Sequence, residues 1–374
     1  MFKKTDPNPQ LDIFTAPSMQ LGSRASKKYS DPNAWHNQFY SLVTTKIDEE
    51  IFKPLFPEGK KSGRPNASIR ILVAMSVLKE GFGCSDEDLF EKCEFDLLTR
   101  KALGMELLTD VTPSIDTYYL FRRRICEYQE RTGIDLMQLC FEQLAGKHVH
   151  LLKISGKCVR MDSKLIGSNI ARQSRYELIH TTLVKFLKTC TLTHLSPEQE
   201  ERAKEYLKED SSKTVYRSDS DTLQSNLARI GNFIMEMLAV FPATSPAHDL
   251  LLRLFEEQYV VMDGKAVLRD KKEVKADSLQ NPNDPDATYR AKNDQKVQGY
   301  VTNITETVEE GKPNIITSVQ VETAVFADCH FLQEAVENSE RVTDSTIEDL
   351  YADGAYQSPD NREFAKNHNA MQLK

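Results

Sequence analysis

Two aspartates stand near the ends of short predicted strands, beside small or polar neighbours. Asp162 lies in the segment Val-Arg-Met-Asp-Ser-Lys, and Asp353 lies in the segment Leu-Tyr-Ala-Asp-Gly-Ala-Tyr. Carboxylates at such positions project from a sheet edge into a crevice, as ligand groups in α/β folds do. Two of them together could hold Mg²⁺ or Mn²⁺, hard ions that prefer oxygen ligands and keep positions open for phosphate oxygens and water. Asp162 and Asp353 are therefore candidate metal ligands and candidate catalytic residues.

The chemistry open to such a pair is phosphoryl transfer. Two metal ions about 3.5 to 4 Å apart clamp the attacking and the leaving oxygen of an in-line phosphodiester displacement. A simpler interpretation exists, because an aspartate before glycine or serine commonly forms a turn or a cap. Spacing alone favours this simpler interpretation for both residues.

Three consecutive arginines, Arg122, Arg123 and Arg124, lie in a predicted helix and are candidate DNA-binding residues. The apolar stripe of this helix consists of Ile115, Tyr118, Phe121, Ile125 and Tyr128. At about 100° per residue, Arg123 points away from that stripe and its two neighbours flank it. Roughly half or more of protein–DNA hydrogen bonds go to the backbone, so arginines fanned in this way could contact phosphates. The alternative is a solvated face paired with Glu127 and Glu130, and the run alone favours it.

Other kinds of site find less support. The chain has no G-x-x-x-x-G-K-[ST] or G-x-G-x-x-G motif to hold a nucleotide, which disfavours an ATPase or a Rossmann enzyme. Its seven cysteines form no C-x-x-C pair, as is typical of reduced thiols in a cytosol. His148 and His150 are expected to share one side of a strand, without a carboxylate or cysteine at ligand spacing.

The elements that must position these residues fall into two parts. Residues 1–60 are predicted to form a loose leader and a first helix over 35–56, and residues 61–150 a compact helical domain, for which the resemblance described below implies DNA binding. One helix start is marked by Ser85, whose hydroxyl can cap a first turn of three acids. After residue 157 the pattern changes to that of short strands.

The second part, residues 151–374, is predicted to hold a mixed sheet. Residues 171–265 are read as a helical insertion after the first strand. The remaining elements follow in the order strand, strand, strand, helix, strand, at 158–163, 297–305, 314–321, 331–339 and 347–352. The expected fold class is therefore α+β, with an all-helical N-terminal domain before the sheet.

Composition limits the class of protein. The chain has 374 residues, enough for two or three domains, and no apolar run approaches the roughly 20 residues of a membrane span. The start, Met-Phe-Lys-Lys-Thr-Asp-Pro, lacks the apolar stretch of a signal peptide, so we expect a cytoplasmic protein. The net charge of -8 argues against a broadly basic surface. Residues 1–150 carry 20 basic and 21 acidic groups, net -1, which leaves -7 for the rest, so DNA binding must come from local patches.

Several motifs taken together resemble bacterial insertion-sequence transposases of the DDE type. The helical part resembles that family in Gly63-Arg64-Pro65, Ile69-Arg70-Ile71-Leu72, Gly83-Cys84-Ser85-Asp86-Glu87-Asp88-Leu89 and Thr117-Tyr118-Tyr119-Leu120-Phe121-Arg122. The second part resembles the family's RNase H-like core in Arg160-Met161-Asp162-Ser163-Lys164, Gly299-Tyr300 and Ala352-Asp353-Gly354-Ala355-Tyr356. The resemblance spans about residues 60–374.

The resemblance implies an enzyme of DNA recombination. Such a transposase binds the terminal inverted repeats of its element and the target DNA, and commonly acts as a homodimer. It cleaves and joins DNA strands with two divalent ions, Mg²⁺ or Mn²⁺. The resemblance gives Asp162 and Asp353 the role of metal ligands, which reverses the preference for a simple turn, and gives Arg122 to Arg124 the role of phosphate contacts.

One departure from the family is large. Its third catalytic acid is a glutamate on a helix after the fifth strand, whereas only 21 residues follow Asp353. Glu363 falls on a predicted helix at 359–367, which is too early. We therefore expect the chain to end before the fifth strand and to be an inactive fragment of a DDE enzyme. The alternatives are a non-catalytic DNA-binding remnant that represses the full-length enzyme and, least favoured, a metal-dependent nuclease without end specificity.

Overall fold

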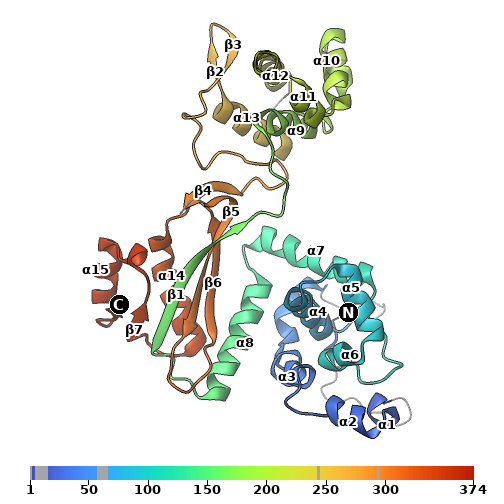
Figure 1. The fold of residues 1–374 in the computed structure, drawn as a ribbon, viewed down its shortest axis with the longest axis vertical. Coiled ribbons are helices and arrows are strands. Elements are labelled where there is room, and N and C mark those ends of the chain that lie inside the picture. Colours follow the sequence, from blue (N-terminus) through green and yellow to red (C-terminus); the bar gives the residue numbers. More distant parts are fainter. Residues whose placement is uncertain (1, 5–15, 57–65, 242–244, 293–294) are drawn as a thin grey trace. The chain divides into compact units, whose positions relative to one another are not determined.

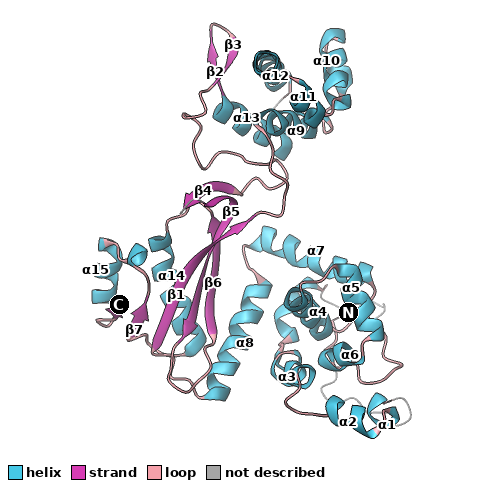
Figure 2. Cartoon of the chain, viewed as in Figure 1, coloured by secondary structure: helices cyan, strands magenta, loops and turns pink. Residues whose placement is uncertain are grey.

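The computed structural model describes the chain apart from residues 1, 5–15, 57–65, 242–244 and 293–294, and it is an α+β protein as predicted (Figures 1 and 2). Gly63, Arg64 and Pro65 of the resemblance lie outside the described residues. The chain divides into two compact units. One consists of Met1–Val159, Glu306–Ser318 and Val336–Asp349, and the other of Arg160–Thr305, Val319–Ala335 and Leu350–Lys374.

The N-terminal region is helical. Its α-helices are α1 Pro17–Gln20, α2 Ser23–Tyr29, α3 Trp35–Leu42, α4 Ile69–Phe82, α5 Asp86–Phe95, α6 Leu97–Leu103, α7 Ile115–Thr132 and α8 Leu136–Leu152. Their apolar faces form a buried core that includes Leu72, Met75, Leu89 and Phe121, and Phe52 from the segment before α4 joins it. The histidines predicted on one side of a strand, His148 and His150, lie on α8 instead, where residues two apart are about 200° apart and do not share a face.

The predicted single helix over 35–56 is wrong. Helix α3 ends at Leu42 and is followed by two 3₁₀ helices, η1 Thr44–Lys46 and η2 Glu49–Leu55. The run Val43-Thr44-Thr45 is β-branched and has low helix propensity. In addition, the Thr44 hydroxyl donates to the carbonyl of Ala102 at 2.7 Å, which fixes the chain at the break.

The predicted start at Ser85 is confirmed. Its hydroxyl accepts from the backbone N–H of Asp88 at 3.1 Å, and the Asp88 carboxylate accepts from the Ser85 N–H at 3.3 Å. This reciprocal capping box satisfies two of the N–H groups that a helix start leaves unpaired. Helix α5 therefore begins where the sequence indicates.

The sheet has the strand order β4-β5-β1-β7-β8, and β6 also pairs with β5. The strands are β1 Cys158–Gly167, β4 Thr288–Lys292, β5 Gln295–Thr307, β6 Ile316–Thr323, β7 Asp349–Tyr351 and β8 Gln372–Leu373. Helix α14, Leu332–Thr343, lies between β6 and β7 along the chain, which confirms the predicted order of strand, strand, strand, helix, strand. Strand β4, antiparallel to β5, was not predicted.

The expectation that no strand follows β7 is wrong. After helix α15, Pro359–Asn367, the chain turns and pairs with β7 as β8. The Ala352 N–H donates to the Lys374 carbonyl at 3.0 Å, and the Lys374 N–H donates to Leu350 at 2.9 Å. Strand β8 has two residues, too few to show the alternation by which a strand is recognised. Glu363 lies exposed on α15, the helix predicted at 359–367.

Gly299 lets β5 approach β1 closely. A Cβ built on this glycine would lie 2.2 Å from the carbonyl oxygen of Ile166 and 2.6 Å from the nitrogen of Ser168. Both contacts are shorter than any real Cβ shows, so only glycine fits without movement of the backbone. This explains the glycine of the Gly299-Tyr300 pair in physical terms.

The region between β1 and β4 is mainly helical, as predicted. It contains α9 Arg175–Leu187, α10 Pro197–Lys208, α11 Ser211–Arg217, α12 Ser220–Val240, α13 Pro246–Gln258 and the hairpin of β2 Tyr259–Met262 with β3 Lys265–Leu268. The hairpin was missed, although its turn is an Asp-Gly pair with positive φ at both residues, a typical hairpin turn. The region has its own buried core, which includes Leu183, Phe186, Phe233, Ile234 and Leu254. No described helix is long and apolar enough to cross a membrane.

Candidate functional site

Asp162 lies on strand β1, and Asp353 lies just after strand β7. At their starts, the Lys157 carbonyl accepts from the backbone N–H of Glu348 at 2.8 Å and of Asp349 at 3.1 Å. Because both strands extend from this point and pair with one another, they run parallel. Asp162 lies five residues after Lys157, and Asp353 lies five residues after Glu348. The register therefore brings the two aspartates to the same level on neighbouring strands.

Each aspartate uses one oxygen locally. Asp162 Oδ1 accepts from the N–H of Ser163 at 2.9 Å. Asp353 Oδ1 accepts from the N–H of Ala355 at 2.7 Å and caps the short 3₁₀ helix η5, Gly354–Tyr356. Both side chains are exposed, and neither forms an ion pair with another described residue. The cap expected of an aspartate before glycine is thus present at Asp353, and it leaves Oδ2 available.

Tyr356 is the buried group next to this pair. The residue is 0% exposed, and its hydroxyl donates to Oδ1 of Asn303 at 2.7 Å. Asn303, on β5, is also 0% exposed and donates from Nδ2 to Oε1 of Gln320 at 2.9 Å. Gln320, on β6, donates in turn to Oε2 of Glu334 at 3.1 Å. A chain of hydrogen bonds, buried from Tyr356 to Gln320, therefore holds the tyrosine in place.

The electrostatics of Tyr356 link it to both aspartates. Burial raises the pKa of its phenol, a hydrogen bond with Ser163 opposes the rise, and the charges of Asp328, Asp162 and Asp353 add to it. Carboxylates act on a phenol in this way when they lie close to it. Asp162 and Asp353 therefore share one neighbourhood, although 190 residues separate them in the chain.

A third carboxylate of this neighbourhood is already paired. Asp328 is 5% exposed, and its Oδ1 accepts from Nη1 of Arg290 at 3.1 Å. Arg290 also donates to the carbonyl of Phe326 at 3.0 Å. Within the described ranges, no group of three or more His, Cys, Asp or Glu side chains is arranged to hold a metal ion. The available donors are thus two carboxylates, whose oxygens suit a hard divalent ion that takes further ligands from water or phosphate.

The arginine run lies on α7, as predicted, and two of its members have acidic partners. Arg122 Nη1 lies 3.9 Å from Oδ2 of Asp86, and Arg123 Nε lies 3.7 Å from Oε1 of Glu127. Glu127 was one of the two partners considered, whereas Asp86 was not. Both arginines are exposed, at 51% and 68% of their side-chain surface, so these pairs are weak.

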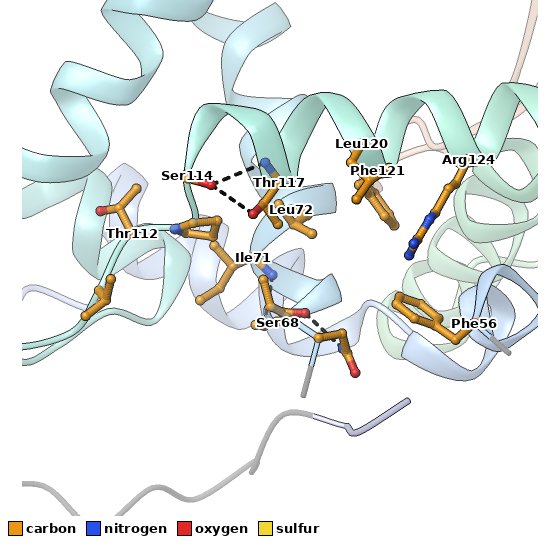
Figure 3. Close-up of a pocket in the computed structure, with 14 residues that line it drawn as sticks. Phe56, Ser68, Ile71, Leu72, Thr112, Ser114, Thr117, Leu120, Phe121 and Arg124 are labelled. Atoms are coloured by element: carbon orange, nitrogen blue, oxygen red, sulfur yellow. Dashed lines mark hydrogen bonds between the residues drawn. The ribbon is translucent and has the colours of Figure 1, made fainter. Parts of the chain in front are cut away.

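Arg124 borders a pocket of about 570 Å³ (Figure 3). Its guanidinium lies 5.8 Å from the centre of the Phe56 ring, a cation–π contact. The pocket is also lined by the starts of α4 and α7, where Ser68 and Ser114 cap the helices. Figure 3 shows the Ser114 hydroxyl directed at Thr117, whose N–H it accepts at 3.3 Å. At the start of each of these helices, a serine hydroxyl therefore already accepts a hydrogen bond from a backbone N–H group.

Residues 28–124 match the family model of a transposase domain (DUF772). The transposase-domain match runs from the end of α2 to Arg124 and includes both the arginine run and the residues that line the pocket. It supports a transposase function and ends before the sheet begins. No curated protein and no solved structure matches the chain.

The supporting residues were missed from sequence, although traces of them were present. Tyr356 stands within the Ala-Asp-Gly-Ala-Tyr segment but was not given a role. Asn303 interrupts a strand of valine and threonine, where asparagine is disfavoured. An asparagine in such a strand indicates a specific buried partner.

Proposed function

We propose that the chain is a DNA transposase of an insertion sequence, with DDE-type chemistry on an RNase H-like core. The match of residues 28–124 to a transposase domain carries the proposal. The adjacent aspartates supply the chemistry that such an enzyme needs, and the order of strands and helix agrees with the core that the sequence resembles.

Asp162 and Asp353 are the proposed ligands of Mg²⁺ or Mn²⁺. Ions bound there would activate an attacking oxygen and stabilise the leaving oxygen of a phosphodiester. Asp162 is held on a paired strand, and Asp353 is held by its own cap, so both present carboxylate oxygen at fixed places. The attacking groups are water and then the freed 3′-hydroxyl of DNA, so no side chain of the chain has to act as a nucleophile.

The helical region is the proposed binding site for terminal repeats. The ion pairs of Arg122 and Arg123 are exposed and are worth about 0–1 kcal/mol, so DNA phosphates can replace the carboxylates at little cost. Binding of this kind weakens steeply with salt. Arg124 is packed on the Phe56 ring, so we expect it to contribute less to phosphate binding than Arg122 and Arg123 do.

DNA binding tests the proposal first. Fluorescence anisotropy with transposon-end DNA and a scrambled duplex, across a salt series, should show tighter binding to the ends. Equal and negligible binding to both would contradict it. A strand-transfer assay with Mg²⁺ or Mn²⁺ then tests the prediction that residues 1–374 alone do not join DNA, and robust joining would overturn that prediction.

A second function is a non-catalytic DNA-binding protein that represses the full-length enzyme. One observation favours it, because Asp328, the third carboxylate that acts on Tyr356, is neutralised by Arg290. End binding without Mn²⁺ affinity at Asp162 and Asp353 would select this function over the first. Homodimer formation across two DNA ends belongs to either proposal, and sedimentation with bound end DNA tests it.

A further inference from the structure

We propose that Tyr356 is a positioning residue, which fixes the Asp353 segment relative to Asp162 through its hydroxyl. The inference rests on the proposed function, in that it assigns a role toward the metal ligands. It concerns a residue that contacts neither metal nor DNA in the proposed mechanism.

The first step is the link between Tyr356 and Asp353. The two residues are the ends of one tight segment, in which Asp353 caps η5 and Tyr356 closes it. The Tyr356 carbonyl accepts from Nδ2 of Asn361 at 2.8 Å, and the same Nδ2 donates to the Cys329 carbonyl at 2.7 Å. Asn361 is 2% exposed. The exposed aspartate therefore stands on a segment whose far end is buried and hydrogen-bonded.

The second step is the link between Tyr356 and β1. The Tyr356 hydroxyl donates to Asn303 on β5 at 2.7 Å. Strand β5 pairs with β1, the strand that carries Asp162. One hydrogen bond thus connects the Asp353 segment with the pair of strands on which Asp162 is held.

The third step is the orientation of Asn303. Its Nδ2 is engaged by Gln320 at 2.9 Å, which turns Oδ1 toward the tyrosine. Buried polar groups that all have partners specify one arrangement, whereas a missing partner is costly. The tyrosine hydroxyl is therefore held by a partner that is itself fixed, which suits it to set a distance between two ligands rather than only to fill space.

The test uses the whole chain and Mn²⁺ as the probe, so it needs no enzymatic activity. Tyr356→Phe keeps the ring and removes the hydroxyl. Tyr259→Phe is the matched control, because Tyr259 is 1% exposed and donates to the Leu227 carbonyl at 2.9 Å, away from the aspartates. Ser163→Ala is a milder second variant, and Asp162→Asn and Asp353→Asn define the metal site.

Two quantities are measured, after circular dichroism has shown that each variant is folded. Mn²⁺ affinity, followed by electron paramagnetic resonance, should fall about tenfold in Tyr356→Phe, as for other groups that orient metal ligands. Amide exchange at Ala355, whose N–H donates to Asp353, should become severalfold faster. Tyr259→Phe should change neither quantity, and Ser163→Ala should change both less than Tyr356→Phe does.

The outcomes separate the two proposals. If the aspartate variants weaken Mn²⁺ binding but Tyr356→Phe behaves like Tyr259→Phe in both measurements, the positioning role is overturned and the proposed metal site stands. If Asp162→Asn and Asp353→Asn bind Mn²⁺ as the unaltered chain does, the proposed metal site is wrong and the positioning role falls with it.

Discussion

At the scale of single residues, the candidate site combines exposed ligands with a buried support. Asp162 and Asp353 are exposed, whereas Tyr356 and Asn303 are fully buried. Exposed carboxylates without ion-pair partners contribute little to folding, so they are free to serve binding. The buried Tyr356 and Asn303 hold the backbone near the aspartates in place, which reduces the conformational entropy that the aspartates lose on binding.

Replacement of Arg123 by alanine tests the DNA-binding face at this scale. We expect weaker binding to DNA and a salt slope smaller by about 1, because one phosphate contact is lost. The free energy of unfolding should change by less than about 0.5 kcal/mol, since the pair with Glu127 is exposed. Anisotropy across a salt series and thermal denaturation measure the two effects. Arg131→Ala, on the same helix but beyond the matched residues, is the control and should weaken binding less.

His180 gives a pH dependence to the insertion. Burial lowers the pKa of this histidine below its ordinary 6.5, although Glu209, 3.6 Å away, opposes the shift. The unfolded chain therefore binds a proton at a higher pH than the folded chain does. The stability contributed by the neutral His180 side chain is fully present above about pH 6.5, and it is lost as the pH drops below that value. Urea unfolding at pH 7 and pH 5 should show the loss, and His180→Gln should reduce the difference between the two pH values.

At the scale of elements, longer helices and strands could be located from the sequence, whereas most of the short strands could not. Sequence patterns located several of the longer elements: α14, β1 and β5 lie near their predicted ranges, and α5 begins at its predicted start. In β1, Val159 and Met161 are buried and alternate with the exposed Arg160 and Asp162. The strands that were missed are β2, β3, β4 and β8. Each has only two to five residues, too few side chains to show the alternation of apolar and polar residues by which a strand is recognised.

Gly299→Ala tests the strand contact. Its Cβ would meet the Ile166 carbonyl at 2.2 Å, so β5 must move from β1 or distort. We expect a loss of about 1–3 kcal/mol of unfolding free energy. Gly167→Ala, where a Cβ meets nothing within 4 Å, is the control and should be nearly neutral. Equal midpoints for the two variants in urea unfolding would contradict the close approach.

At the scale of the whole molecule, two separate hydrophobic cores stand out. The core of the helical N-terminal region and that of the insertion share no residue. Asn303 and Tyr356, which are 53 residues apart in the chain, belong to neither core. Their hydrogen bond forms only once the sheet is assembled. No sequence period reports such a contact, which is why the support of the aspartates could not be predicted while the aspartates themselves could.

The separate cores predict unfolding in more than one step. Trp35, the single tryptophan, lies on α3, packs edge-on against Phe82 of α4 and reports on the N-terminal helical region. Phe233→Ala removes a fully buried ring from the insertion core, which should cost about 3–5 kcal/mol there. The circular dichroism transition should shift to lower urea while the Trp35 fluorescence midpoint stays unchanged. A common shift of both probes would show a single cooperative unit.

The parallel pairing of β1 with β7 also sets an order of events during synthesis. The contact between Lys157 and Glu348 joins residues 191 positions apart. At about 5–20 residues per second, β1 leaves the ribosome roughly 10–40 s before its partner does. During that time the helical regions on either side can fold, whereas Val159 and Met161 have no β7 to pack beside. The candidate site therefore cannot assemble until β7 has been made, long after the strand that carries Asp162.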